Sequence, residues 1–89
     1  MADLTSIPNV GPRIAADFHR LGINDPEDLR GHDGDQLYEQ LCADDGIHHD
    51  ICLRDTFVAA IAYVETGDDR PWWIHSRERL AAAAQERST

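Results

Sequence analysis

The sequence predicts an all-α fold, a compact bundle of about five or six short helices in a single domain spanning residues 1–89. Apolar residues recur at helical spacing in the segments between chain breakers. Glycines close these segments, and Asp, Asp–Pro and Ser, which are typical helix starts, open the next ones. A chain of 89 residues with 42% hydrophobic residues is long enough for one modest core.

The first two predicted helices flank the segment IPNVGPRIA, residues 7–15. Asp3 can cap a short helix over residues 4–7, which the sequence PNVG then ends. Pro12 suits the first position of the next helix, because its fixed φ is helical and it has no N–H group to leave unpaired. Gly22 ends this second helix, whose apolar face carries Ile14, Phe18 and Leu21.

Two further starts follow at short intervals. Asp25 followed by Pro26 opens a short third helix that ends near Gly31. Asp33 with Gln36 three residues later is typical of a capping box, and it predicts the start of a fourth helix. The apolar stripe of that helix consists of Leu37, Tyr38 and Leu41.

The fifth predicted helix, DICLRDTFVAAIAYVE over residues 50–65, carries little polar surface and should be the most buried. Asp55 lies within it, and a buried carboxylate there needs an arginine or a backbone N–H as its partner. PWWIH, residues 71–75, is expected to be a connector. Ser76 then caps a last, alanine-rich helix over residues 77–89 that frays at its end.

The charge balance is strongly acidic. The chain has 17 acidic residues against eight arginines and no lysine, which gives a net charge of −9. A domain that holds nucleic acid by bulk electrostatics should be basic, so any DNA contact here must be local. We interpret the excess acid as a solvated surface.

Neither a membrane segment nor a secretion signal is evident, which favours a cytoplasmic protein. The only cysteines, Cys42 and Cys52, are expected to be reduced, with a single disulfide as the alternative.

The stretch LTSIPNVGPRIAADFHRLGI, residues 4–23, resembles a helix-hairpin-helix motif through its apolar-Pro-x-apolar-Gly turn. The usual motif has glycine on both sides of the apolar residue, whereas this chain has Asn9 at the first of these positions. In such motifs the backbone N–H groups of the turn, together with the helix dipole, hold a DNA phosphate without reading sequence. The resemblance implies DNA contacts at Asn9, Val10, Gly11, Arg13, Ile14 and Arg20, while the side chain of Val10 packs inward between the helices.

The rest of the chain resembles one small bacterial family known under the names pathogenicity locus and mitomycin resistance. The resemblance rests on LYEQLC at residues 37–42, on DICLRDTFVAA at residues 50–60, and on RPWW at residues 70–73. It implies a compact SAM-like domain of the helix-hairpin-helix type that binds DNA. The family names describe loci and phenotypes, so they specify no reaction.

Other constellations of polar residues predict no further site. The segment CADDGIHHDIC contains metal-ligand residue types, but their spacing matches no zinc pattern, so we expect neither a metal nor a cofactor. We find no nucleophile–base pair and no nucleotide-binding loop, which argues against an enzyme and against a small-molecule substrate. The residues considered as possible ligands in that segment are Cys42, His48, His49, Asp50 and Cys52.

Two functions are compatible with these patterns. The first is a non-enzymatic DNA-binding module that contacts phosphates weakly and without sequence preference. The alternative is a protein-interaction module, with Trp72, Trp73 and the last helix as contacts for a basic partner. One tryptophan is expected to cover the edge of the core and the other to be exposed, and stacking on bases is a further use for either.

Overall fold

The computed structural model describes residues 3–87 and confirms the all-α class, with no strand among these residues. Four α-helices are joined by loops that contain two 3-10 helices. The first and third predicted helices are these single 3-10 turns. The elements are η1 (Leu4–Ser6), α1 (Pro12–Arg20), η2 (Pro26–Leu29), α2 (Gly34–Asp45), α3 (Ile51–Thr66) and α4 (Trp72–Arg87).

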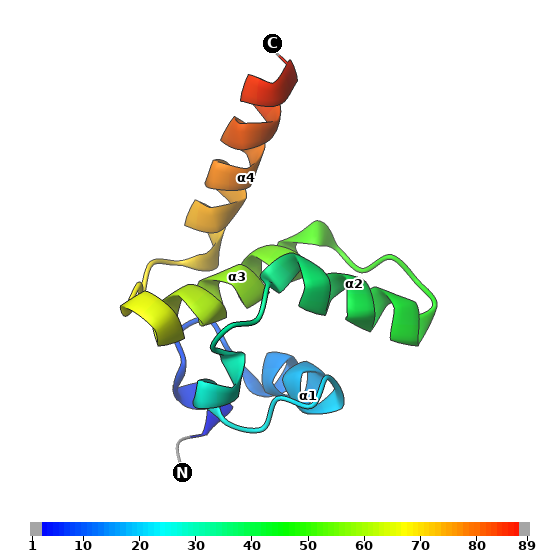
Figure 1. The fold of residues 1–89 in the computed structure, drawn as a ribbon, viewed down its shortest axis with the longest axis vertical. Helices are drawn as coiled ribbons and strands as arrows, with labels where there is room; N and C mark the ends of the chain where they lie inside the picture. Colours follow the sequence, from blue (N-terminus) through cyan, green and yellow to red (C-terminus); the bar gives the residue numbers. More distant parts are fainter. Residues whose placement is uncertain (1–2, 88–89) are drawn as a thin grey trace.

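Helices α2 and α3 lie side by side, α1 lies below them in the view of Figure 1, and α4 projects away from this body. Phe18 of α1 and Phe57 of α3 are fully buried, and their ring centroids are 4.9 Å apart. Val10 is buried in the same core, as predicted for its side chain. Because α2, α4 and η2 all pack on α3, that helix is the centre of the fold, as its apolar sequence predicts.

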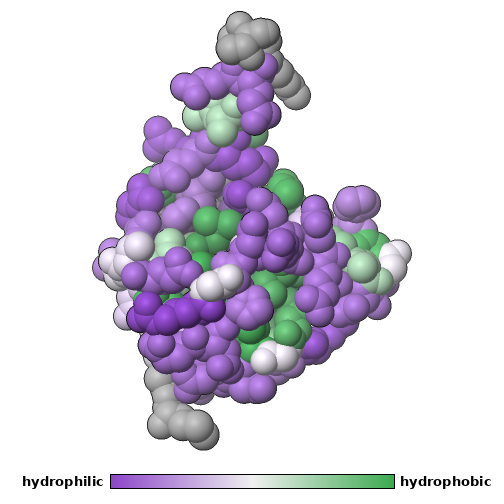
Figure 2. All heavy atoms as spheres, in the orientation of Figure 1, coloured by the Kyte–Doolittle hydropathy of each residue, from purple (hydrophilic) through white to green (hydrophobic). Residues whose placement is uncertain are grey.

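The surface of this fold is mostly hydrophilic, but apolar atoms are visible in the hollow between α1 and the α2–α3 pair (Figure 2). No helix among residues 3–87 combines the length and the apolar character needed to cross a bilayer.

A capping box forms at the start of η2, one element before the start of α2, where it was predicted. At η2 the side chain of Asp25 accepts from the backbone of the first turn, while Asp28 accepts from the backbone N–H of Asp25 at 3.2 Å. Asp33, expected to form such a box with Gln36, caps α2 by accepting from the N–H of Asp35 at 2.9 Å.

The start of α4 differs from the prediction. This helix begins at Trp72, so the segment PWWIH supplies its first turn and is not a connector. Ser76 is therefore inside the helix and caps nothing. Its hydroxyl donates instead to Oδ2 of Asp55 at 2.5 Å. The prediction of a cap at Ser76 was wrong because a distant residue, Asn9, binds the N–H of Trp72.

Asp55 joins α3 to α4. Its carboxylate is completely buried and accepts from Arg54 at 2.9 Å, from Arg79 at 3.1 Å and from Ser76. This confirms the expectation of an arginine partner. Burial by itself would raise the pKa of Asp55, but the hydrogen bonds from Arg79, Ser76 and Arg54 hold that pKa below its usual value.

Gly34 sets the distance between α2 and α3. A β-carbon at this residue would lie 2.5 Å from Cγ2 of Val58 and 3.1 Å from its backbone nitrogen. We therefore expect Gly34→Ala to lower the free energy of unfolding by about 1–3 kcal/mol in a urea titration, because backbone must move. Gly11→Ala is the control, since nothing lies within 4 Å of the added carbon there, and its stability should fall only by the smaller cost of alanine at a helix N-cap. Equal stability of the two variants would contradict this packing.

Candidate nucleic-acid interface

The turn that precedes α1 leaves several backbone donors open. The N–H of Val10 donates to the carbonyl of Ile7 at 3.1 Å, so that group is already used. Within residues 3–87, no acceptor is bound to the N–H groups of Gly11, Arg13 or Ile14. The first N–H groups of a helix point out of its N-terminus, where the helix dipole is positive. The start of α1 therefore presents unpaired donors to an external acceptor.

Asn9 occupies the position where the resembling motif has glycine, and its backbone has the geometry that favours glycine. Its φ is +72°, and it is the non-glycine residue with positive φ in the described part of the chain. The side chain contacts the α3–α4 connector: Nδ2 donates to the carbonyl of Arg70 at 3.1 Å, and Oδ1 accepts from the N–H of Trp72 at 3.3 Å. Asn9 thus ties the turn to the start of α4.

This dual role of Asn9 predicts an order of stabilities. Asn9→Ala removes both hydrogen bonds and keeps a β-carbon at positive φ, so the free energy of unfolding should fall by about 2–3 kcal/mol. Asn9→Gly removes the same bonds but relieves the backbone, so its loss should be smaller. Urea denaturation of the three proteins measures the order, and a glycine variant more stable than the natural chain would contradict a bonding role for Asn9.

Arg13 is an exposed side chain in the first turn of α1, and no carboxylate pairs with it among the described residues. The other arginines with described side chains are engaged. Arg77 lies 5.9 Å from the ring centroid of Trp73. Ion pairs to carboxylates hold Arg20, Arg30, Arg54, Arg70 and Arg79. Among these side chains, Arg13 is the arginine with neither a carboxylate nor an aromatic ring as its partner.

Arg20, the other predicted phosphate contact on α1, is already bound. Its guanidinium pairs with Asp45 at the end of α2 and lies 4.0 Å from Asp17. The hydrogen bond that Arg20 donates to Asp45 raises the pKa of Arg20. Asp45 also accepts from the ring of His49 at 2.6 Å if that nitrogen carries its proton. A DNA contact by Arg20 would have to displace this network.

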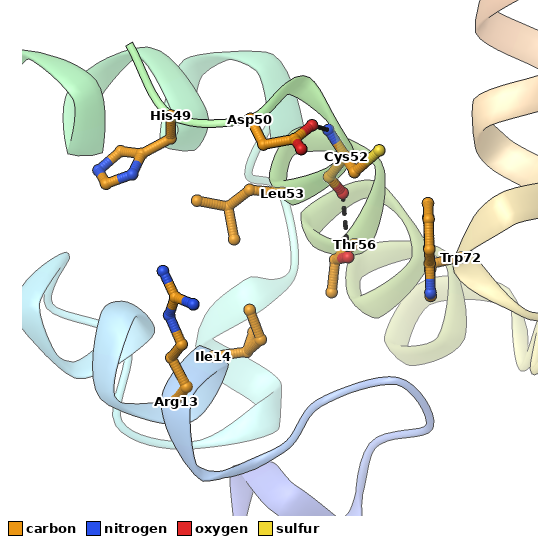
Figure 3. Close-up of a pocket in the computed structure, with 8 residues that line it drawn as sticks. All are labelled: Arg13, Ile14, His49, Asp50, Cys52, Leu53, Thr56 and Trp72. Atoms are coloured by element: carbon orange, nitrogen blue, oxygen red, sulfur yellow. Dashed lines mark hydrogen bonds between the residues drawn. The ribbon is translucent and has the colours of Figure 1, made fainter. Parts of the chain in front are cut away.

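Arg13 and Ile14 line one wall of a groove of about 240 Å³ between the starts of α1, α3 and α4 (Figure 3). Its apolar walls are Ile14, Leu53 and Trp72. Asp50, the cap of α3, lies on the opposite wall from Arg13 and accepts from the N–H of Cys52 at 2.9 Å. Hydrogen bonds from Cys52 hold the pKa of Asp50 below its usual value. The remaining lining residues are His49, Cys52 and Thr56.

The sequence pattern of the pathogenicity-locus family, Cdd1, matches residues 1–81 of this chain. The chain belongs to this family. It is similar to the mitomycin resistance protein McrB of Streptomyces lavendulae, with 40% identity over 85 residues that cover 96% of this chain and 81% of that protein. No solved structure matches the chain. The turn, Arg13 and the whole groove lie within the part that matches the pathogenicity-locus family.

In this member of the pathogenicity-locus family, the two adjacent tryptophans have different surroundings. Trp72 is half-buried and lines the groove. Trp73 is 46% exposed and lies beneath Arg77. The exposure of Trp73 agrees with the prediction that one of the two faces outward, whereas Trp72 lines the groove and is not among the described side chains that pack on the core. No sequence pattern predicted that Leu53 and Thr56 would join Trp72, because residues from different helices form the groove.

The possible metal ligands serve other purposes. No group of three or more His, Cys, Asp or Glu side chains in the described residues is placed to hold a metal ion. The sulfur of Cys42 accepts from the backbone N–H of His49 at 3.4 Å, and both Cys42 and Cys52 are free thiols. Hydrogen bonding to Asp50, with burial, raises the pKa of Cys52, which disfavours a reactive thiolate.

Proposed function

We propose that this chain is a non-enzymatic module that binds the phosphate backbone of DNA through the start of α1, weakly and without sequence preference. The observation that carries the proposal is the coincidence of open N–H groups at Gly11, Arg13 and Ile14 with the unpaired guanidinium of Arg13. N–H groups at a helix start bind phosphate oxygens, and a guanidinium adds a charged, forked donor. Such contacts carry no direct sequence information.

Three features support a SAM-like fold with a helix-hairpin-helix motif over residues 4–23. η1 and α1 flank a tight turn, Val10 is buried with the core, and the backbone of Asn9 has the positive φ that the motif usually gives to glycine. The first helix of the motif is reduced to one 3-10 turn here. The N–H of Val10 and the guanidinium of Arg20 have bonds within the chain, whereas the bonds of Asn9 are made by its side chain. We assign the phosphate contact to the start of α1, at Gly11, Arg13 and Ile14.

The net charge of −9 limits the strength of this binding. At physiological salt, charges further away than about 8 Å are largely screened, so the local donors decide whether a phosphate binds. Non-specific DNA binding then lies at about 10⁻⁴ M or weaker, at the low end of the usual range.

A salt titration tests the proposal. Fluorescence anisotropy of a labelled oligonucleotide should show binding at low salt, and the logarithm of the affinity should fall linearly with that of the salt concentration. A slope of about −1 to −2 is expected for one or two phosphate contacts. Absence of binding at low salt, or an affinity that does not respond to salt, would overturn the proposal.

One observation favours the alternative, a protein-interaction module. Helix α4 projects beyond the body of the molecule, and Leu80 on this part is 59% exposed (Figure 1). Trp73 adds a second exposed apolar side chain at the base of the same helix. Capture of a specific basic protein that Leu80→Glu abolishes, in a chain that binds no DNA, would favour this reading.

A further inference from the structure

We propose that the groove beside the turn accepts an unstacked nucleobase, so that the ligand of this module is single-stranded DNA. This inference rests on the proposed phosphate contact and names the class of DNA that the same site takes. Arg13 and Ile14 themselves line the groove. A nucleotide whose phosphate is bound at the start of α1 therefore has its base within reach of the groove.

The groove has the chemistry of a base-binding slot. Ile14 and Leu53 supply apolar surface on opposite sides, and Trp72 closes one end. Figure 3 shows the indole of Trp72 edge-on, with one of its faces turned toward Ile14 and Thr56. A base has two apolar faces that stack on aromatic rings whatever its identity, as in proteins that bind single strands without sequence preference.

The charges of the groove orient the nucleotide. Arg13 and the open N–H groups are on the α1 wall, whereas the ionised carboxylate of Asp50 is on the α3 wall. Asp50 would repel a phosphate, but it can accept from the exocyclic amine of a base such as cytosine. The phosphate therefore lies against α1, and the base enters between Ile14 and Leu53 with its polar edge toward Asp50.

A paired duplex cannot fill this groove. Its bases are stacked and paired, and extruding one of them requires energy that a single strand does not have to supply. The net negative charge of the protein also favours a single strand, because a single strand has a lower charge density than a duplex and is repelled less.

The main comparison is between two strands with the same number of phosphates, one with bases and one without. Anisotropy at low salt would measure the binding of a short oligo-dC strand, an abasic strand of the same length, a blunt duplex and free dCMP. Oligo-dC should bind about tenfold more tightly than the abasic strand, the size expected from one stacked base. Trp72→Leu, which keeps its backbone bond to Asn9, should remove this advantage, and Trp73→Leu, the matched control, should keep it.

A fluorescence measurement does not depend on the folding of the Trp72 variant. The chain has two tryptophans, so Trp73→Phe leaves Trp72 as its one indole. Oligo-dC should quench the emission of Trp72 in that protein. The abasic strand should leave the emission unchanged, even at concentrations that saturate the protein.

Each outcome separates the inference from the proposed function. Equal affinity for oligo-dC and the abasic strand, with binding that Arg13→Glu removes, would overturn the base slot and leave the phosphate contact standing. A preference for oligo-dC, with an affinity that Arg13→Glu leaves unchanged, would support the slot and overturn the phosphate contact. Free dCMP that binds as tightly as the strand, a duplex preferred to the strand, or no binding to any ligand would overturn the inference.

Discussion

Replacing Asp55 by asparagine is expected to lower the free energy of unfolding by about 3–5 kcal/mol at neutral pH. The substitution keeps the shape of the side chain but removes the negative charge that Arg54, Ser76 and Arg79 surround. Arg79 has no other carboxylate partner in the described part of the chain, so its charge would be left largely buried beside a neutral amide. The hydrogen bonds that join Asp55 of α3 to Ser76 and Arg79 of α4 would weaken.

Urea denaturation followed by circular dichroism measures this loss. Glu39→Gln is the matched control, because it removes one negative charge from an exposed position on α2 and should change stability by less than about 0.5 kcal/mol. Comparable losses in the two variants would show that net charge, and not the buried bonds of Asp55, decides the effect.

The pH dependence of this loss has a definite sign. The pKa of Asp55 is lower in the folded protein than in the unfolded chain, where it is about 3.9. The carboxylate therefore contributes its full stabilisation above pH 4 or so, and this contribution is lost as the pH falls through the lower folded value. The difference in stability between the natural chain and Asp55→Asn should narrow in acid, and a constant difference down to about pH 2 would contradict the assignment.

Arg13→Glu is expected to reduce the affinity for DNA by about tenfold to a hundredfold. A charge-assisted hydrogen bond to phosphate is lost, and a negative charge is placed at the start of α1, where the phosphate would lie. The fold should be unaffected, because the side chain of Arg13 is exposed and has no carboxylate partner among residues 3–87.

The control for Arg13→Glu is Arg30→Glu. It makes the same change in net charge on an exposed arginine directly after η2, which does not line the groove. Affinity measured at one low salt concentration should fall strongly only for the Arg13 variant, and the salt slope should decrease by about one for Arg13→Gln. An equal fall in affinity for Arg30→Glu would show that the net charge of the protein causes the effect, and it would contradict a local contact at Arg13.

Local signals predicted the elements of this fold well. Pro12 begins α1, Asp33 caps α2, and the apolar sequence of residues 50–65 forms the central helix. The arginine partners of the buried Asp55 were also predicted, since a carboxylate inside such a helix needs a hydrogen-bond donor. These features depend on residues close together in the chain or on the general cost of burying a charge.

The start of α4 depends on contacts between distant residues, and there the local reading failed. Asn9 caps this helix from 63 positions away, a distance no capping pattern covers. Arg70 also shapes the connector: its bonds to Asp68 hold the pKa of that carboxyl down to about 2. Because the helix begins at Trp72, the two tryptophans have different environments and the groove gains its end wall.

The most direct test of the central claim is an NMR titration of the ¹⁵N-labelled protein with short single-stranded DNA. We expect the amide signals of Gly11, Arg13 and Ile14 to shift first, together with the indole signal of Trp72. Shifts confined to Trp73 and to the part of α4 around Leu80 would place the binding surface away from the turn and contradict a contact at the start of α1.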